Sequence, residues 1–240
     1  MENMPIKCEY CGRELEYEEL GSVAGKKWTF PKPCDCKEAT AARKRFEQEE
    51  KERERREAIE RHQNRLKKAG IMPYWWNRCQ PDHSYDETLQ SGMGLYIDGA
   101  IGTGKTHKAV SIAMACLESR WTVKFTSMRD ITRRLRATWG ERGMDEEGVF
   151  TSLMRPRILI LDDLGKESMT ETVLRDLFDL VDKRKDMMLP IIVTTNYSKP
   201  ELIARMTHGL DDTTTAESIV SRLREITKRV PVDGEDRRLQ

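Results

Sequence analysis

The chain has 240 residues, of which 35% are charged and 38% are apolar, and its formal net charge at pH 7 is +1. This near balance excludes a polycation that binds nucleic acid over its whole surface, so any such contact must come from a local patch. The first residues contain no apolar segment typical of a signal peptide, and no run of about 18 apolar residues predicts a membrane span. Six cysteines in such a chain favour reduced thiols or metal ligands over disulfides. We therefore expect a cytoplasmic protein with no membrane partner.

Four of the cysteines lie near the N-terminus as two close pairs, separated by a stretch with strand-forming residues at 27–30. Such pairs suit a tetrahedral thiolate zinc site, and a bound metal would supply folding energy that about 35 residues cannot obtain from a core. The alternative is four free surface thiols. We predict a small zinc-binding module over residues 1–36, structural rather than catalytic because four thiolates leave no open position on the metal. The predicted ligands are Cys8, Cys11, Cys34 and Cys36.

Residues 37–69 are dominated by charged side chains and predict one long helix. Acid–base pairs four residues apart, such as Glu52 with Arg56 and Glu57 with Arg61, favour a solvated helix about 45 Å long. No heptad of apolar residues is sustained, so a coiled coil is not predicted. The helix is either a polar spacer or an arm that holds the zinc module away from the rest of the chain and reaches a partner.

Residues 71–92 are rich in loop-forming residues and contain three consecutive aromatic side chains. Tyr74, Trp75 and Trp76 either pack beside an adenine base or belong to the core, which is the more common fate of adjacent aromatic residues.

The strongest motif follows at residues 99–106, between an apolar strand at 95–97 and an amphipathic helix at 105–119. Its glycines permit a backbone that turns its N–H groups inward, where a triphosphate accepts them. The helix adds the positive end of its dipole. Lys105 is placed to reach the outer phosphates and the Thr106 hydroxyl to bind Mg²⁺, so we predict ATP and Mg²⁺ as ligands. The predicted nucleotide contacts are Gly99, Ala100, Ile101, Gly102, Thr103, Gly104, Lys105 and Thr106.

Further elements alternate in type, as an α/β fold requires. We expect, in chain order, a strand at 122–126, a helix at 130–139, a strand ending at 162, a helix at 171–185, a strand at 190–195, helices at 200–206 and 216–228, and a strand at 230–232.

Polar side chains follow two of the buried strands. Asp162 and Asp163 end the first, at the edge where open α/β sheets place ligands. Asp162 would hold Mg²⁺, and Asp163 would orient or deprotonate the attacking water; the alternative is a capping aspartate. Asn196 ends the next strand and would hydrogen-bond the γ-phosphate or the water, although asparagine is also common before turns.

These motifs, in this order, resemble those of an AAA+ ATPase of the DnaC/IstB type, which comprises helicase loaders and transposition helper ATPases. The motifs that carry the likeness lie at residues 99–106, 158–165, 191–196 and 221–223, with further likeness at 69–73 and 234–237. The resemblance covers about residues 69–238. It implies a P-loop AAA+ three-layer α/β fold with a mostly parallel sheet over residues 70–240, without a C-terminal lid.

The resemblance also implies roles for single residues. Lys105 and Thr106 are similar to Walker A contacts, Asp162 and Asp163 to Walker B acids, and Asn196 to sensor 1. Arg222 resembles an arginine finger that acts in a neighbouring subunit, which implies self-association on ATP binding and weak hydrolysis by the isolated monomer. Many AAA+ proteins have glutamate where this chain has Asp163, and we expect the shorter acid to slow hydrolysis.

Residues 129–154 resemble a helical insertion that carries basic residues toward single-stranded DNA. The candidate contacts are Arg129, Arg133, Arg134, Arg136 and Arg142. The alternative is a solvated helix face. An N-terminal zinc module resembles the part of some loaders that docks on the replicative helicase.

The leading hypothesis is therefore an ATP-dependent helicase loader that binds single-stranded DNA. The alternatives are a transposition helper that acts on duplex DNA with a transposase, and a nucleotide-switch adaptor that does not hydrolyse ATP.

Overall fold

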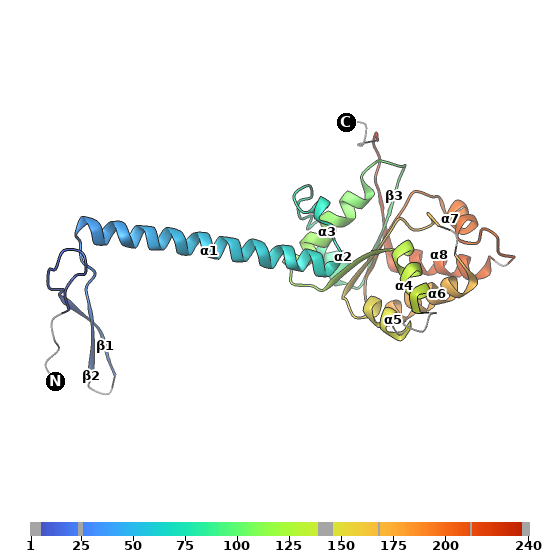
Figure 1. Cartoon of the computed structure of the whole chain (residues 1–240). Coiled ribbons are helices and arrows are strands. Elements are labelled where there is room, and N and C mark those ends of the chain that lie inside the picture. Colours follow the sequence, from blue (N-terminus) through green and yellow to red (C-terminus); the bar gives the residue numbers. More distant parts are fainter. Residues whose placement is uncertain (1–5, 24–25, 139–145, 168, 212, 237–240) are drawn as a thin grey trace. The chain divides into compact units, whose positions relative to one another are not determined.

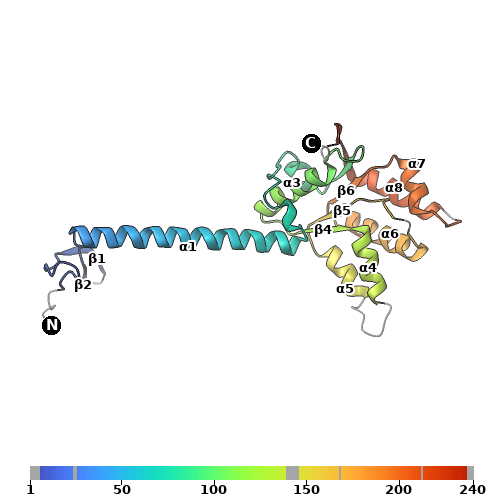
Figure 2. The ribbon, with the colours of Figure 1, turned by 45° about the horizontal axis from the view of Figure 1, so that its top comes forward.

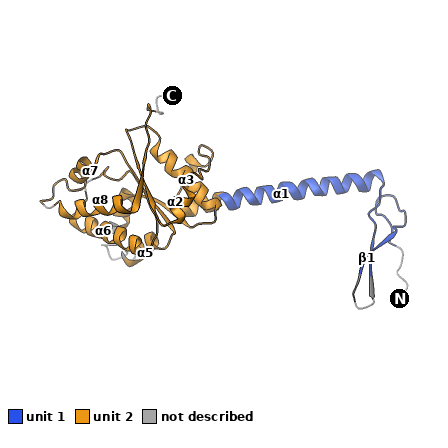
Figure 3. Ribbon diagram, turned by 180° about the vertical axis from the view of Figure 1, so that it is seen from behind, with its two compact units in different colours: residues 1–62 blue, residues 63–240 orange. Residues whose placement is uncertain are grey.

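The structure is a computed structural model that describes residues 6–23, 26–138, 146–167, 169–211 and 213–236. The chain forms two compact units, Met1–His62 and Gln63–Gln240, which Figure 3 colours separately. The boundary lies inside helix α1 (Lys37–Ala69), so each unit contains part of this helix. Among the described residues, no helix is both long and apolar enough to cross a lipid bilayer.

The first unit contains an antiparallel hairpin of β1 (Tyr17–Val23) and β2 (Lys26–Pro31). The sequence predicted only the second of these strands. Trp28 and Phe30 on β2 expose 58% and 53% of their surface. Because an isolated two-stranded hairpin is marginally stable in water, this unit needs another source of folding energy.

Helix α1 confirms the prediction of one long charged helix. Arg56 lies 3.1 Å from Glu52, and Arg61 lies 3.3 Å from Glu57, as the spacing predicted. These pairs are exposed to solvent, so each contributes only about 0.3–0.5 kcal/mol.

The last turn of α1 packs into the second unit. Leu66 and Ala69 are buried in its core. The N–H groups of Gly70 and Ile71 donate to the carbonyls of Lys67 and Leu66 and so close the helix end. Gly70 has a φ of +86°, and a Cβ there would lie 2.4 Å from the carbonyl oxygen of Phe125, so only glycine fits.

The second unit is built on a five-stranded parallel sheet of order β4-β5-β6-β3-β7. Figure 2 labels β4, β5 and β6 of this sheet. The strands are β3 (Gly94–Asp98), β4 (Val123–Ser127), β5 (Ile158–Asp162), β6 (Ile191–Thr195) and β7 (Thr227–Pro231). Alternate residues of β5 enter opposite core layers, with Ile160 in one and Leu161 in the other. This alternation requires apolar cover on both faces of the sheet.

Helices supply that cover, so the predicted three-layer α/β architecture is confirmed (Figure 1). The end of α1, α2 and α3 pack on one face, and α4 to α8 on the other. The helices are α2 (Asp86–Gln90), α3 (Lys105–Glu118), α4 (Met128–Thr138), α5 (Glu146–Met154), α6 (Glu171–Asp186), α7 (Lys199–Met206) and α8 (Thr214–Ile226), with a 3-10 turn at Pro73–Trp75.

Some element boundaries differ from the sequence prediction. Helix α4 begins at Met128 rather than 130, because the Ser127 hydroxyl accepts from the N–H of Asp130, 3.2 Å away, and acts as the cap. Residues 149–154, the last part of the stretch that resembles a helical insertion, belong to α5. Helix α8 ends at Ile226, and the last strand begins directly after it.

One buried cation connects elements at the amino ends of β5 and β6. The guanidinium of Arg184 on α6 is fully buried and donates to five carbonyl oxygens, at distances from 2.8 to 3.4 Å. The acceptors are Leu153, Met154, Pro156, Arg157 and Pro190. Burial lowers its pKa to about 10, which leaves it charged at neutral pH. The side chain thus ties the α5–β5 junction to the start of β6.

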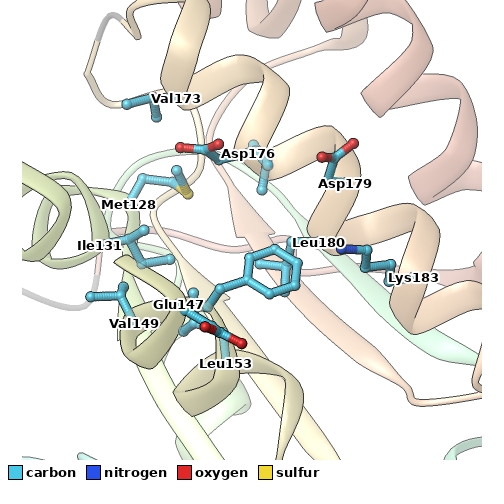
Figure 4. A pocket seen from close by; sticks show the side chains of 12 residues that line it. Met128, Ile131, Glu147, Val149, Leu153, Val173, Asp176, Asp179, Leu180 and Lys183 are labelled. Atoms are coloured by element: carbon cyan, nitrogen blue, oxygen red, sulfur yellow. The ribbon is translucent and has the colours of Figure 1, made fainter. Parts of the chain in front are cut away.

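A cavity of about 230 Å³ lies between α4, α5 and α6 (Figure 4). Its floor is apolar, with Ile131 and Leu180 among the lining residues, and Asp176 and Asp179 lie at its rim. The residues that line it do not include any of the glycine loop at 99–106, so it is separate from the predicted nucleotide site.

Candidate functional site

The glycine loop joins β3 to α3 in a conformation that three glycines make possible. Gly99, Gly102 and Gly104 have φ angles of +157°, +83° and +100°. The loop is also crowded, since a Cβ on Gly99 would lie 2.1 Å from the carbonyl oxygen of Val232. A Cβ on Gly102 would lie 2.0 Å from a carboxylate oxygen of Asp236. At Gly99 the close neighbour is backbone, so a side chain is excluded there. At Gly102 the neighbour is the movable end of a side chain, and the positive φ is what favours glycine.

Lys105 and Thr106 begin α3 directly after this loop. Lys105 is 5% exposed, and its ammonium donates to the carbonyl of Ala100, 2.6 Å away. The Thr106 hydroxyl donates to Oδ1 of Asp162 at 3.1 Å, across the gap between α3 and the end of β5. The structure therefore brings the predicted Walker A and first Walker B residues together in one place.

Asp162 is further held by β6, through a residue that the sequence analysis missed. The Thr194 hydroxyl donates to Asp162 at 2.7 Å and accepts from the N–H of Asp163 at 2.8 Å. Thr194 is fully buried, and its only sequence signal is a hydroxyl near the end of an apolar strand. Burial raises the pKa of Asp162, although the hydrogen bonds from the two threonines oppose this rise. A partly buried carboxylate that, among the described residues, accepts from two side-chain hydroxyls is well suited to a divalent cation.

Asp163 and Asn196 lie at the same edge of the sheet. Asp163 has a φ of +57°, which is uncommon for a residue with a side chain, and its carboxylate pairs with Lys166 at 2.8 Å. Both residues line a cavity of about 650 Å³ together with Lys105 and Thr106. This volume is within the range of small-molecule sites.

Two of the three aromatic residues at 74–76 belong to this cavity. Tyr74 and Trp75 line it, with ring centroids 4.8 Å apart in an edge-to-face arrangement. The Trp76 indole instead donates to the carbonyl of Ile71 at 2.9 Å and packs against the core. Trp75 also packs against the core, so the core alternative holds for Trp75 and Trp76. Packing beside an adenine base stays a prediction for the two residues that line the cavity.

The predicted arginine finger lies elsewhere in the second unit. Arg222 on α8 pairs with Asp182 on α6 at 3.1 Å and with Glu225 at 3.5 Å. It is not among the residues that line the nucleotide cavity. Within one chain, Arg222 is therefore part of a surface ion-pair cluster.

Three of the arginines predicted to contact DNA lie on α4 with described side chains, and each of them has a partner. Arg129 pairs with Glu167, Arg133 pairs with Asp130 at 3.0 Å, and Arg134 donates to the Ser152 hydroxyl at 3.1 Å. The side chain of Arg136, and Arg142 altogether, lie outside the described residues.

The four N-terminal cysteines converge in the first unit, with all sulfur atoms within 4.8 Å of one another. The Sγ atoms of Cys8 and Cys36 are 3.9 Å apart, and those of Cys11 and Cys34 are 3.5 Å apart. Four sulfurs around a zinc ion at about 2.3 Å would be separated by about 3.8 Å, so the arrangement fits a tetrahedral metal site.

The thiol pKa values in this cluster diverge, as expected for like charges held close together. The backbone N–H groups of Cys11 and Tyr10 lower the pKa of the Cys8 thiol to about 7. The N–H of Ala39 lowers the pKa of Cys36, but burial and the other three thiols raise it more, to about 12. Four thiolates can coexist here only if a cation neutralises them.

The parallel sheet, the glycine loop after β3 and the paired acids after β5 define a P-loop ATP-binding protein of the AAA+ class. The chain belongs to the family of IstB-like ATP binding proteins, whose family model matches residues 89–240.

Two curated relatives place it near helicase loaders and insertion-sequence proteins. It is 29% identical over 159 residues to the replicative helicase loader DnaI of Bacillus subtilis. The matched region covers 65% of this chain and 50% of DnaI. It is 31% identical over 111 residues to a putative insertion sequence ATP-binding protein of Sinorhizobium fredii, covering 46% of this chain and 36% of that protein. This chain thus spans half or less of the length of these relatives.

Comparison with solved structures supports the same fold. A crystal structure of the DnaC helicase loader superimposes with a TM-score of 0.54 and 22% identity, covering 68% of this chain and all of that one. At this identity, the likeness establishes the AAA+ fold of the second unit.

The partial burial of Asp162 leads to a prediction for the protein without nucleotide or Mg²⁺. Burial raises the pKa of Asp162 in the folded state above the pKa of an ordinary aspartate. At a pH above the folded-state pKa, ionisation of Asp162 therefore lowers the free energy of unfolding. This cost disappears when the pH falls below the pKa of an ordinary aspartate. At pH 7.5, Asp162→Asn should therefore raise the free energy of unfolding by a small amount, on the order of 1 kcal/mol. Urea denaturation of both proteins at pH 7.5 and pH 4.5 measures this; the gain should shrink at the lower pH. A variant that is clearly less stable at pH 7.5 would contradict the burial argument.

Proposed function

We propose that this chain is an ATP-dependent loader of a replicative DNA helicase. Family membership and the similarity to DnaI support the class of activity. The observation that carries the proposal is the approach of Thr106 to Asp162 beside the glycine loop. This geometry offers amides and an ammonium to phosphates, and a hydroxyl and a carboxylate to Mg²⁺.

In the proposed hydrolysis reaction, the ammonium of Lys105 leaves the Ala100 carbonyl for the outer phosphates of ATP. Asp163 orients the attacking water and accepts its proton, and Asn196 donates to the γ-phosphate or to the water. Mg²⁺, when bound at Thr106 and Asp162, neutralises charge on the phosphates.

Arg222 acts in a neighbouring subunit in this proposal. It would have to leave Asp182 and Glu225 to reach a γ-phosphate. ATP binding would favour this self-association, and an isolated chain would hydrolyse ATP slowly because it lacks the arginine that stabilises transition-state charge.

The arginines of α4 are proposed to bind the phosphates of single-stranded DNA. Arg129 and Arg133 support this, since 69% and 78% of their side chains are exposed and both belong to one helix. Arg134, Arg136 and Arg142 complete the set that the sequence suggested. Such contacts would be independent of sequence and sensitive to salt.

The N-terminal unit is proposed to hold zinc at its four cysteines and to contact the helicase. Its exposed aromatic side chains support a docking role, because Tyr10, Trp28 and Phe30 are each more than half exposed. We assign residues 1–36 to this module, 37–69 to a helical linker and 70–240 to the ATPase domain, and place the activity in the cytoplasm.

Two alternatives remain as outcomes of the tests. Similarity to insertion-sequence ATP-binding proteins favours a transposition helper, which would prefer long duplex DNA over single strands. The ion pair between Lys166 and Asp163 favours a nucleotide switch without hydrolysis, which would bind ATP but release no phosphate.

Substitution of the loop lysine tests the ATPase proposal. Lys105→Ala should reduce steady-state phosphate release by at least about 100-fold, because the phosphates lose their positioning cation. Release should be measured with and without a single-stranded oligonucleotide, beside Lys67→Ala, which alters an exposed lysine of α1 and should behave as the wild type. Equal rates in Lys105→Ala and wild type would rule out this site as the source of the activity.

A cysteine substitution tests the N-terminal proposal. We expect the wild type to contain about one zinc per chain by elemental analysis, and Cys11→Ser to lose most of it because a four-thiolate site cannot spare a ligand. Cys11→Ser should also fail to capture the cognate replicative helicase in a pull-down, while its affinity for Mg²⁺-ATP stays unchanged.

The matched control is Cys79→Ala, which alters a buried thiol of the second unit and should retain both zinc and capture. A wild type without zinc would contradict the metal assignment. Undiminished capture by a zinc-free Cys11→Ser protein would show that the module is not the docking part.

A further inference from the structure

Two ion pairs lie between Asp163, the acid directly after β5, and the first turn of α4. The ammonium of Lys166 lies 2.8 Å from Oδ2 of Asp163. The next residue, Glu167, accepts a hydrogen bond from Nε of Arg129. The acid proposed to act on water and an arginine proposed to bind DNA are therefore joined by adjacent side chains of one short loop.

The backbone of this loop is fixed at its beginning. The N–H groups of Asp163 and Leu164 donate to the hydroxyl and the carbonyl of Thr194, at 2.8 and 2.9 Å. Gly165 follows with a φ of +87°, and a Cβ there would lie 2.4 Å from Leu202. Asp163 is thus anchored to β6, and the ion pairs can change partners without displacing it.

The ion pairs themselves are accessible and therefore weak. The side chains of Lys166 and Arg129 are 58% and 69% exposed. Exposed pairs of this kind change an equilibrium by no more than about fivefold, so a phosphate that offers more negative charge can compete for the arginine. An ammonium on Oδ2 nevertheless occupies an acceptor site of Asp163 and reduces its capacity to take a proton from water.

We propose that Lys166 is a positioning residue that withholds the Asp163 carboxylate from water, and that a nucleic-acid phosphate on Arg129 releases this hold through Glu167. When a phosphate binds the guanidinium, the Glu167 carboxylate loses its cation and competes with Asp163 for the Lys166 ammonium. Asp163 then becomes available to water. This inference rests on the proposed function, since it requires hydrolysis at Asp163 and DNA at α4.

The first test concerns the hold on Asp163 and uses the full chain without DNA. Lys166→Met should raise kcat for phosphate release about twofold to fivefold and leave KM for ATP unchanged. Lys166→Arg should keep the wild-type rate, because it preserves the ion pair. Arg61→Met removes another exposed pair, with Glu57 of α1 at 3.3 Å, and should have no effect. An unchanged or reduced kcat in Lys166→Met would contradict the proposal that Lys166 withholds the Asp163 carboxylate from water.

The second test concerns coupling to DNA and adds an oligothymidylate. In the wild type, saturating oligonucleotide should raise kcat by a factor similar to that of Lys166→Met. Arg129→Gln and Glu167→Gln should raise the DNA-free rate and show no further rise with DNA. Arg133→Gln, which lacks a link to Glu167, should need more oligonucleotide but retain the rise at saturation. A full rise in Arg129→Gln at saturation would overturn the coupling.

Amide hydrogen exchange over residues 163–167 gives a readout that does not depend on hydrolysis. Oligonucleotide binding should speed exchange there in the wild type and not in Arg129→Gln. A wild type that binds ATP and DNA but releases no phosphate would contradict the proposed hydrolysis, and exchange would then decide the coupling. Normal DNA binding and hydrolysis, with neither rate nor exchange altered by DNA, would contradict the coupling alone. A chain that does not bind the oligonucleotide would contradict both the DNA part of the proposed function and the coupling.

Discussion

The hydrogen bonds around the Asp162 carboxylate are the interaction on which the candidate nucleotide site depends. Thr106 reaches this carboxylate from the first turn of α3, and Thr194 reaches it from β6, so one partly buried group joins three elements at the carboxyl edge of the sheet. Such a group is costly to bury without partners, and two hydroxyls satisfy only part of its acceptor capacity. The carboxylate can therefore accept a cation as a further partner. The glycine loop beside it can bind the phosphates that such a cation accompanies.

The sequence was sufficient to predict the features that depend on local patterns. The glycine loop, the apolar strand that ends in Asp162, and the pairs of α1 at Glu52 and Glu57 follow from spacing alone. The resemblance of four motifs to one ATPase family added the three-layer architecture, which the strand order confirms. Residue-level roles at the site remain proposals, because they concern ligands that bind to it.

Long-range contacts were beyond the reach of sequence patterns. Nothing local marks Thr194 as the bridge between Asp162 and the backbone of Asp163, because the bridge exists only when β5 and β6 lie side by side. The burial of Arg184 is a stronger example, since an arginine in a run of charged residues predicts a solvated position. Its five acceptors come from two chain segments that only the fold brings together.

The two units obtain their stability in different ways. The second buries a continuous apolar core on both faces of its sheet, whereas the first consists of a hairpin, a cysteine cluster and the beginning of a charged helix. A unit of the latter kind would gain folding energy from a metal at its four cysteines. The second unit has its own apolar core and needs no such contribution.

Isothermal calorimetry of ATP binding, in Mg²⁺ and then in excess EDTA, tests the central claim most directly. If Thr106, Asp162 and the glycine loop form one site for a metal-bound triphosphate, ATP should bind once per chain in Mg²⁺. Its affinity in EDTA should then be weaker by at least about tenfold, a difference of about 1.4 kcal/mol. Equal affinity in the two buffers, or no heat in either, would contradict the account.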